Sequence, residues 1–317
     1  MELHRFRARR AVALMLLGVT LLVAWMTIDT VWSTRSVSET EIAAAKEQAE
    51  QEVESYKAEY DRCVADPEAY FGSPDIPVSE CQLFESDYTW YLTRAPLSIE
   101  QEVDDTGKAA VIFLAGIAII VGATFAGADW TTGSMGNQLL FRPRRLQVWA
   151  AKAAAVALGA TAVAAVVIAA QWATYFVTAD VRGLGHSPGL VQEVVETGLR
   201  GLALVAGGAV GGFALSMLLR STVGTLALVF FYSVGGEALV AVLPIDQASR
   251  WSPANNVFAW LDNGIEIYDE SIVCQPRDMD CMQMFTLSLT HGAVYLAALL
   301  ALVVVASALL FRRRDVP

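Results

Sequence analysis

The stretch DWTTGSMGNQLLFRPRRLQVWAAK, residues 129–152, decides how the rest of the chain is interpreted. It lies between two long apolar runs and contains glycines, a proline and basic residues: Gly133, Gly136, Pro143, Arg142, Arg144, Arg145 and Lys152. It is too polar to cross a bilayer, but its interleaved apolar residues would let it lie along a membrane surface. Pro143 should end any helix near Phe141, and the arginines beside it should lie among lipid headgroups on the cytoplasmic side.

The composition is that of a membrane protein with several spans. The chain has 317 residues, of which 55% are hydrophobic and only 17% are charged, and its mean hydropathy is positive. We therefore expect an all-α polytopic membrane protein with six transmembrane helices. The spans are expected within residues 1–32, 108–128, 146–178, 194–219, 220–243 and 287–317, where the first and last ranges include the chain ends and 220–243 includes a short cytoplasmic turn.

Three arginine clusters orient these spans. They lie at residues 5–10, 142–145 and 312–314, and six spans place all three on one side. Because positive charge favours the cytoplasm, both termini and the 129–145 segment are expected inside, with the protein in the cell membrane. Together with Lys152 at the start of the third span, the cytoplasmic segments then hold twelve of the 22 Lys and Arg residues but only three of the 33 Asp and Glu residues. The net charge of −11 thus hides a basic cytoplasmic face and an acidic exterior.

The exterior should contain a helical insertion pinned by a disulfide, at residues 33–107 between spans 1 and 2. Ser38 and Glu41 have the spacing of a capping box, and small and aromatic residues then recur every three or four positions, which predicts a helix over about 39–62. Residues 179–193 are expected to form an external loop, and residues 244–286 a second external region.

All four cysteines, Cys63, Cys81, Cys274 and Cys281, fall in these external segments, which favours disulfides over a metal site. Three pairings are possible, and proximity in the sequence favours Cys63–Cys81 and Cys274–Cys281. His4, His186 and His291 are scattered, and none has ligand spacing from a cysteine.

The 129–152 stretch resembles the cytoplasmic loop of ABC-2 type ABC transporter permeases. The shared order is an acidic residue, a Thr-Gly-Ser step, a short apolar helix, an arginine-rich turn and a lysine opening the next span. Here these are Asp129, Thr132-Gly133-Ser134-Met135, Leu139-Leu140-Phe141, Arg142-Pro143-Arg144-Arg145 and Lys152. The family more often has Glu at the first position and Leu in place of Met135.

The resemblance implies that residues 129–145 form a coupling helix that docks on a separate ATPase subunit. Asp129, Thr132, Gly133 and Ser134 would start and dock the helix. Arg142, Arg144 and Arg145 would hold it at the membrane surface or pair with ATPase carboxylates. The resemblance also implies that residues 244–286 could be re-entrant as well as external, and that the permease forms a homodimer or heterodimer. The alternative interpretation of the stretch is an ordinary basic cytoplasmic loop, which would need only the arginines.

The chain has no G-x-x-x-x-G-K-[ST] phosphate loop, so ATP and Mg would be bound by the partner, and no cofactor is expected in this chain. We expect no enzyme activity of its own and no nucleic-acid partner. Membrane lipid is the other expected contact. A secondary transporter or channel is one alternative, for which Glu237 would be a functional carboxylate inside a span. A membrane-anchored external binding or regulatory protein is another.

The expected fourth span contains Gly207, Gly208, Gly211 and Gly212, which form two overlapping G-x-x-x-G spacings. Such spacings let two helices approach closely. From the sequence, the partner helix could belong to the same subunit or to a second copy.

Overall fold

The computed structural model describes residues 2–73, 77–82, 86–92, 94–141, 144–242, 245, 247–269 and 283–313. The chain forms two compact units. The first, the helical bundle, comprises residues 1–27, 99–176 and 186–317. The second, the hairpin unit, comprises residues 28–98 and 177–185.

Among the described residues, six helical segments are long and apolar enough to cross a membrane, as expected for a multi-pass membrane protein. They are α2 (Arg10–Ser33), Ile99–Thr131, α8 (Arg145–Val181), α9 (Leu190–Leu219), α10 (Thr222–Val242) and α12 (Leu289–Arg313). The second segment consists of α5 (Ile99–Glu102), the π-helical turn η3 (Val103–Gly107) and α6 (Lys108–Thr131). It therefore starts earlier than the expected 108, because the acidic residues before Lys108 continue the helix.

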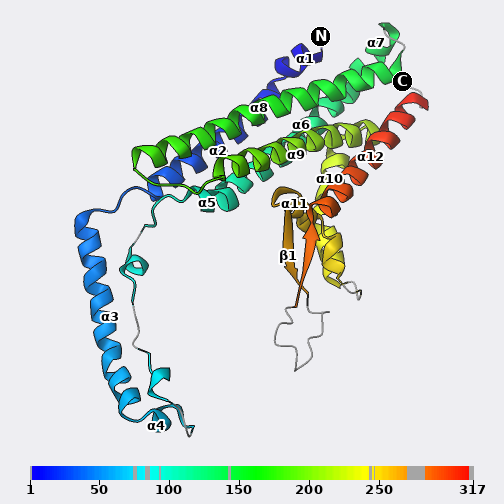
Figure 1. Ribbon diagram of the computed structural model, residues 1–317. Coiled ribbons are helices and arrows are strands. Elements are labelled where there is room, and N and C mark those ends of the chain that lie inside the picture. Colours follow the sequence, from blue (N-terminus) through cyan, green and yellow to red (C-terminus); the bar gives the residue numbers. More distant parts are fainter. Residues whose placement is uncertain are drawn as a thin grey trace. The chain divides into compact units, whose positions relative to one another are not determined.

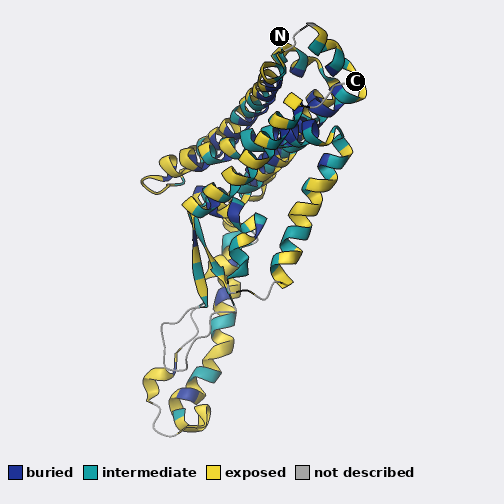
Figure 2. Cartoon of the chain, turned by 90° about the vertical axis from the view of Figure 1, so that its right-hand side faces the viewer, coloured by how far each residue is buried: buried dark blue, intermediate teal, exposed yellow. Residues whose placement is uncertain are grey.

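Close packing of α6 against α9 forms the centre of the bundle. A Cβ atom on Gly212 would lie 2.1 Å from the carbonyl oxygen of Ile119, and one on Gly122 would lie 2.1 Å from that of Ala209. Only glycine permits this backbone approach. Figure 2 shows buried residues concentrated in the bundle centre, while long stretches of the outer helices are exposed.

The four neighbouring glycines of α9 thus pack within the subunit. Gly208 and Gly212 face α6, whereas Gly207 and Gly211 face Leu300 of α12, at an ordinary contact distance of 3.6 Å. Intramolecular packing, one of the two alternatives left open by the spacing, thus accounts for contacts of all four glycines.

The described residues between α10 and α12 include two short helices and a pair of β-strands. The helices are η4 (Ala248–Trp251) and α11 (Pro253–Leu261). The strands β1 (Gly264–Tyr268) and β2 (Met284–Ser288) pair antiparallel, with Gly264 opposite Ser288 and Tyr268 opposite Met284. The expectation of an all-α chain is therefore wrong here. The alternation of apolar and polar residues in GIEIY and MFTLS favours strands, but each run is only five residues long.

The hairpin unit is built on α3 (Glu39–Ala65), close to the predicted 39–62. The capping box is present, since Ser38 Oγ accepts from the Glu41 amide and Glu41 accepts from the Ser38 amide. The Ser38 amide and hydroxyl both donate hydrogen bonds to the Glu41 carboxylate, and these lower its pKa. After α3 the chain folds back through α4 (Pro67–Phe71), η1 (Val78–Glu80) and η2 (Tyr88–Tyr91).

A disulfide joins Cys63 to Cys81 and confirms that pairing. The predicted Cys274–Cys281 bridge lies outside the described residues.

Replacing both Cys63 and Cys81 with serine should destabilise the hairpin unit by about 3 kcal/mol, because the bridge closes a loop with a sequence separation of 18. Limited trypsin digestion would measure this through cleavage in α3, where Lys57 and Arg62 are targets. Reduction of the wild-type protein should have the same effect. Cleavage that stays at the wild-type rate would contradict the prediction.

Candidate functional site

The link between α6 and α8 makes a sharp bend. Thr132 donates from its amide (3.2 Å) and its hydroxyl (2.7 Å) to the Ala128 carbonyl oxygen, which closes the last turn of α6. Gly133 follows with a φ of +66°, the left-handed conformation that suits glycine after a helix. The short helix α7 (Ser134–Phe141) then begins, and it ends at Phe141, as Pro143 predicts.

Asp129 lies beneath this bend and is only 2% exposed. Asp129 belongs to the last turns of α6 (Lys108–Thr131), and not to the start of α7, where the resemblance placed it. Its Oδ1 accepts from Ser134 Oγ at 2.9 Å and from the Arg9 guanidinium, and its Oδ2 accepts from Lys152 Nζ at 2.6 Å. One carboxylate therefore joins α7, the N-terminal segment and α8.

Lys152 is the most enclosed of the charged residues around Asp129, at 0% exposed. It lies in the third turn of α8, and its Nζ contacts Glu2 Oε2 of α1 (Glu2–Ala8) at 3.2 Å as well as Asp129. Arg9 donates a second hydrogen bond, of 2.6 Å, to the Phe125 carbonyl oxygen. Because each buried charge meets an opposite charge and further hydrogen bonds, the cluster can remain ionised.

Aromatic packing closes the cluster. The Phe125 ring lies 4.5 Å from the Arg9 guanidinium carbon and 5.4 Å from Lys152 Nζ. Phe6 of α1 packs against Phe125, at 5.7 Å between ring centroids, and its ring also lies against Gly159 of α8. The N-terminal helix is thus part of the structure that supports α7.

We call Glu2, Arg9, Asp129 and Lys152, together with Ser134, the charge cluster.

Helix α7 has one anchored side and one free side. Met135 is 1% exposed and holds the helix against the bundle, whereas Leu140 is 80% exposed. Thr132, Gly133 and Asn137 are also exposed. The free side is therefore a small surface of mixed polar and apolar character at the end of the bundle where α1 and the end of α12 also lie (Figure 1).

A groove of about 1290 Å³ lies beside α7, between α1 and the first turns of α8. Arg5, Arg9 and Arg144 line it, together with Asn137 and Gln138 of α7. Glu2 and Asp129 also line the groove and pair with Arg5 and Arg9, so three arginines against two carboxylates leave a net charge of +1. The groove is therefore weakly basic, and it adjoins the free side of α7. Arg145 is the first residue of α8, and Arg142 lies outside the described residues.

No protein-family model, curated protein or solved structure matches the chain. The geometry of the α6–α7–α8 bend therefore carries the functional argument.

The structure brings together Asp129, Ser134 and Lys152 but separates them from the exposed Thr132 and Gly133. The sequence interpretation did not find Glu2 and Arg9, since four arginines in residues 5–10 are explained equally well by membrane topology. Their contacts with the buried Asp129–Lys152 pair follow only from the packing of the N-terminal segment.

Glu237, the candidate carboxylate inside a span, has a local structural partner. Its Oε1 accepts from the Ala254 amide at 2.7 Å and from Ser252 Oγ at 2.9 Å. Ser252 is the N-cap of α11, so the Glu237 carboxylate lies at that helix N-terminus, where negative charge is favourable. These hydrogen bonds give the carboxylate a structural role, because they attach α10, which carries Glu237, to the start of α11.

Proposed function

We propose that the protein is the membrane-spanning permease subunit of an ABC-2 type exporter, and that the free side of α7 docks on a separate cytoplasmic ATPase. The observation that carries the proposal is the bend itself, in which the short helix α7 lies between two span-length helices. Met135 and Ser134 hold one side of α7 against the bundle, and the other side is exposed. An ordinary basic loop would need neither the buried charge cluster nor the anchored Met135.

The charge cluster supplies a physical route for coupling. Through Asp129, a displacement of α7 is transmitted to α6, and through Lys152 and Arg9 it reaches α8 and the N-terminal segment. ATP binding and hydrolysis on the partner would change its contacts with α7. The difference in those contacts between two states is the only energy available to shift the spans.

The remaining parts of the proposal follow from the resemblance and the charge pattern. ATP and Mg belong to the partner, and this chain is a transport subunit without enzyme activity of its own. Two permease subunits, identical or different, form the transporter in the cell membrane. The end of the bundle that carries α1, α7 and the end of α12 faces the cytoplasm, and the basic groove faces ATPase carboxylates or lipid headgroups.

Substituting Leu140 with arginine should abolish co-purification of the ATPase, because Leu140 is the most exposed apolar residue of the proposed docking surface. The full chain would be purified from its native membrane. Bound proteins would be identified by mass spectrometry, and ATP hydrolysis by the complex would be measured. We expect a partner that contains a phosphate loop, and a reduction of at least tenfold in its yield with Leu140→Arg, equivalent to about 1.4 kcal/mol.

Val191→Arg is the matched control, since Val191 is 54% exposed in the first turn of α9, at the other end of the bundle. It should leave the yield unchanged. A wild-type preparation that carries no ATPase would contradict the proposal, as would equal yields from the two variants.

A further inference from the structure

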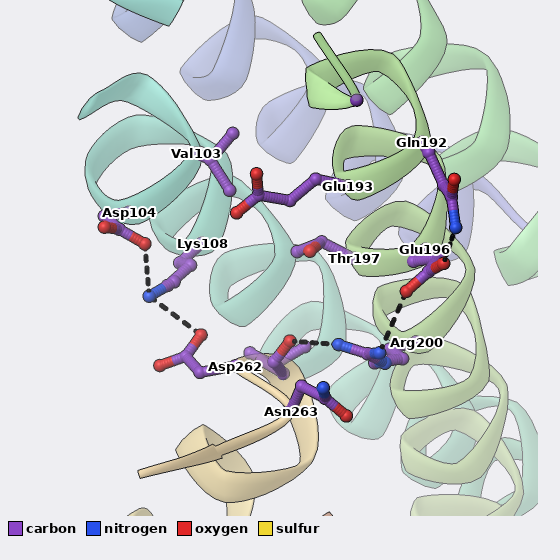
Figure 3. Close-up of a pocket in the computed structure, with 12 residues that line it drawn as sticks. Val103, Asp104, Lys108, Gln192, Glu193, Glu196, Thr197, Arg200, Asp262 and Asn263 are labelled. Atoms are coloured by element: carbon purple, nitrogen blue, oxygen red, sulfur yellow. Dashed lines mark hydrogen bonds and ion pairs between the residues drawn. The ribbon is translucent and has the colours of Figure 1, made fainter. Parts of the chain in front are cut away.

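A second cavity, of about 410 Å³, lies at the other end of α6 from the charge cluster (Figure 3). Its walls come from η3 and the start of α6, the first turns of α9 and the turn after α11. The charged residues that line it are Asp104, Lys108, Glu193, Glu196, Arg200 and Asp262. Four carboxylates thus face two cations.

Both cations are already neutralised by neighbours. Lys108 Nζ lies 2.8 Å from Asp104 Oδ1 and 2.8 Å from Asp262 Oδ1. Arg200 donates to the Leu261 carbonyl oxygen at 3.1 Å and to Glu196 Oε2 at 3.3 Å. The cavity therefore retains an excess of negative charge and has no cation free to bind an anion.

Glu193 and Thr197 provide the unused hydrogen-bonding groups. They lie one turn apart on α9, and Figure 3 shows both side chains directed from α9 into the space in front of α6. Within the described part of the chain, neither side chain has a hydrogen-bond or ion-pair partner. Thr197 is only 9% exposed and its hydroxyl group opens onto the cavity, whereas Glu193 is exposed at the cavity rim, so a bound donor could reach both.

We propose that this cavity binds a small organic cation, whose ammonium or guanidinium group donates hydrogen bonds to the Glu193 carboxylate and the Thr197 hydroxyl. Such a group has several donors and no acceptor, which matches two free acceptors beside a negative excess. The side chains of Val103 and Leu261 offer apolar contact for its carbon atoms. The volume is within the range of small-molecule sites, about 300–1,000 Å³.

A bare metal ion fits these residues less well. Among the described residues, no group of three or more His, Cys, Asp or Glu side chains is arranged to hold a metal. Asp104 and Asp262 are both held by Lys108. An organic cation needs only the free carboxylate and hydroxyl, together with the apolar wall.

Isothermal titration of the purified full-length protein with 1,4-diaminobutane tests the proposal. We expect saturable binding of the diamine and none of 1,4-butanediol, which has the same length without the charge. Glu193→Gln should weaken binding at least tenfold, because it removes a charge-assisted hydrogen bond. Thr197→Val should weaken it about threefold to tenfold, and Thr197→Ser, which keeps the hydroxyl, should retain the wild-type affinity.

Glu266→Gln is the control, because Glu266 is an exposed carboxylate of β1 that does not line the cavity. It should bind the diamine as the wild type does. The proposal is overturned if the wild type does not bind the diamine at millimolar concentration, if butanediol binds equally well, or if Glu193→Gln keeps full affinity. Tighter binding of Mg²⁺ that also depends on Glu193 would overturn it as well. These readouts do not involve the ATPase, so either proposal can fail alone.

Discussion

Replacing Asp129 with alanine is expected to lower the free energy of unfolding of the helical bundle by about 3–5 kcal/mol, the cost of removing one partner from a buried ion pair. Lys152 is 0% exposed and would keep only Glu2, at 3.2 Å, while Arg9 would lose its carboxylate partner. Unfolding in increasing concentrations of SDS, followed by tryptophan fluorescence, measures the loss. Trp130 and Trp149 lie on the helices concerned.

The double variant Asp129→Leu/Lys152→Met separates charge from packing. It removes both buried charges and fills their space with apolar atoms, and such replacements are often neutral. The Arg9 side chain is 23% exposed and can turn toward water. The double variant should therefore unfold closer to the wild type than Asp129→Ala does. If Asp129→Ala unfolded within about 0.5 kcal/mol of the wild type, the range typical of surface substitutions, the charge cluster would not stabilise the bend.

The Asp129 substitution also bears on the proposed coupling. Since Asp129 is 2% exposed, it should influence the ATPase only through the position of α7. We expect Asp129→Ala to reduce stability and ATPase co-purification together. Loss of co-purification with unchanged stability would mean that the carboxylate contacts the partner directly, contrary to its burial in this structure.

Substituting Gly212 with alanine should destabilise the bundle by about 3 kcal/mol, at the upper end of overpacking effects. The added Cβ would lie 2.1 Å from the Ile119 carbonyl oxygen and 2.9 Å from the carbonyl carbon. These are backbone atoms in the middle of α6, so no side-chain rotation can make room. The two helices must separate, and the equally close contact of Gly122 with Ala209 is then lost.

Gly211→Ala is the control on the adjacent residue. Its Cβ would meet Leu300 at 3.6 Å, an ordinary contact. Because alanine is favoured over glycine in a helix by about 1 kcal/mol, this variant should be neutral or slightly stabilised. The same SDS unfolding measurement applies to both. Equal effects of the two substitutions would show that α6 and α9 are not packed as described.

Helix content, span number and the Cys63–Cys81 bridge could be predicted because they depend on local or near-local signals. A run of about 20 apolar residues must form a helix in lipid, since its backbone groups have no other partners. Ser38 and Glu41 are only three residues apart. A glycine such as Gly133 and a proline such as Pro143 set the conformation that their own part of the backbone can adopt. The β1–β2 pairing was missed because it joins strands separated by 15 residues, with too short a pattern in each.

Hydropathy and charge along the chain were thus sufficient to predict six span-length helices and a polar bend between the second and the third of them. The partners across the bundle were settled only by packing: Asp129 with Arg9 and Lys152, Gly212 with Ile119, and Glu237 with the start of α11. An apolar helix has a similar hydropathy on every side, so its sequence does not say which side meets which neighbour. Steric fit and the matching of buried charges choose that side, and both require the helices to be placed in three dimensions.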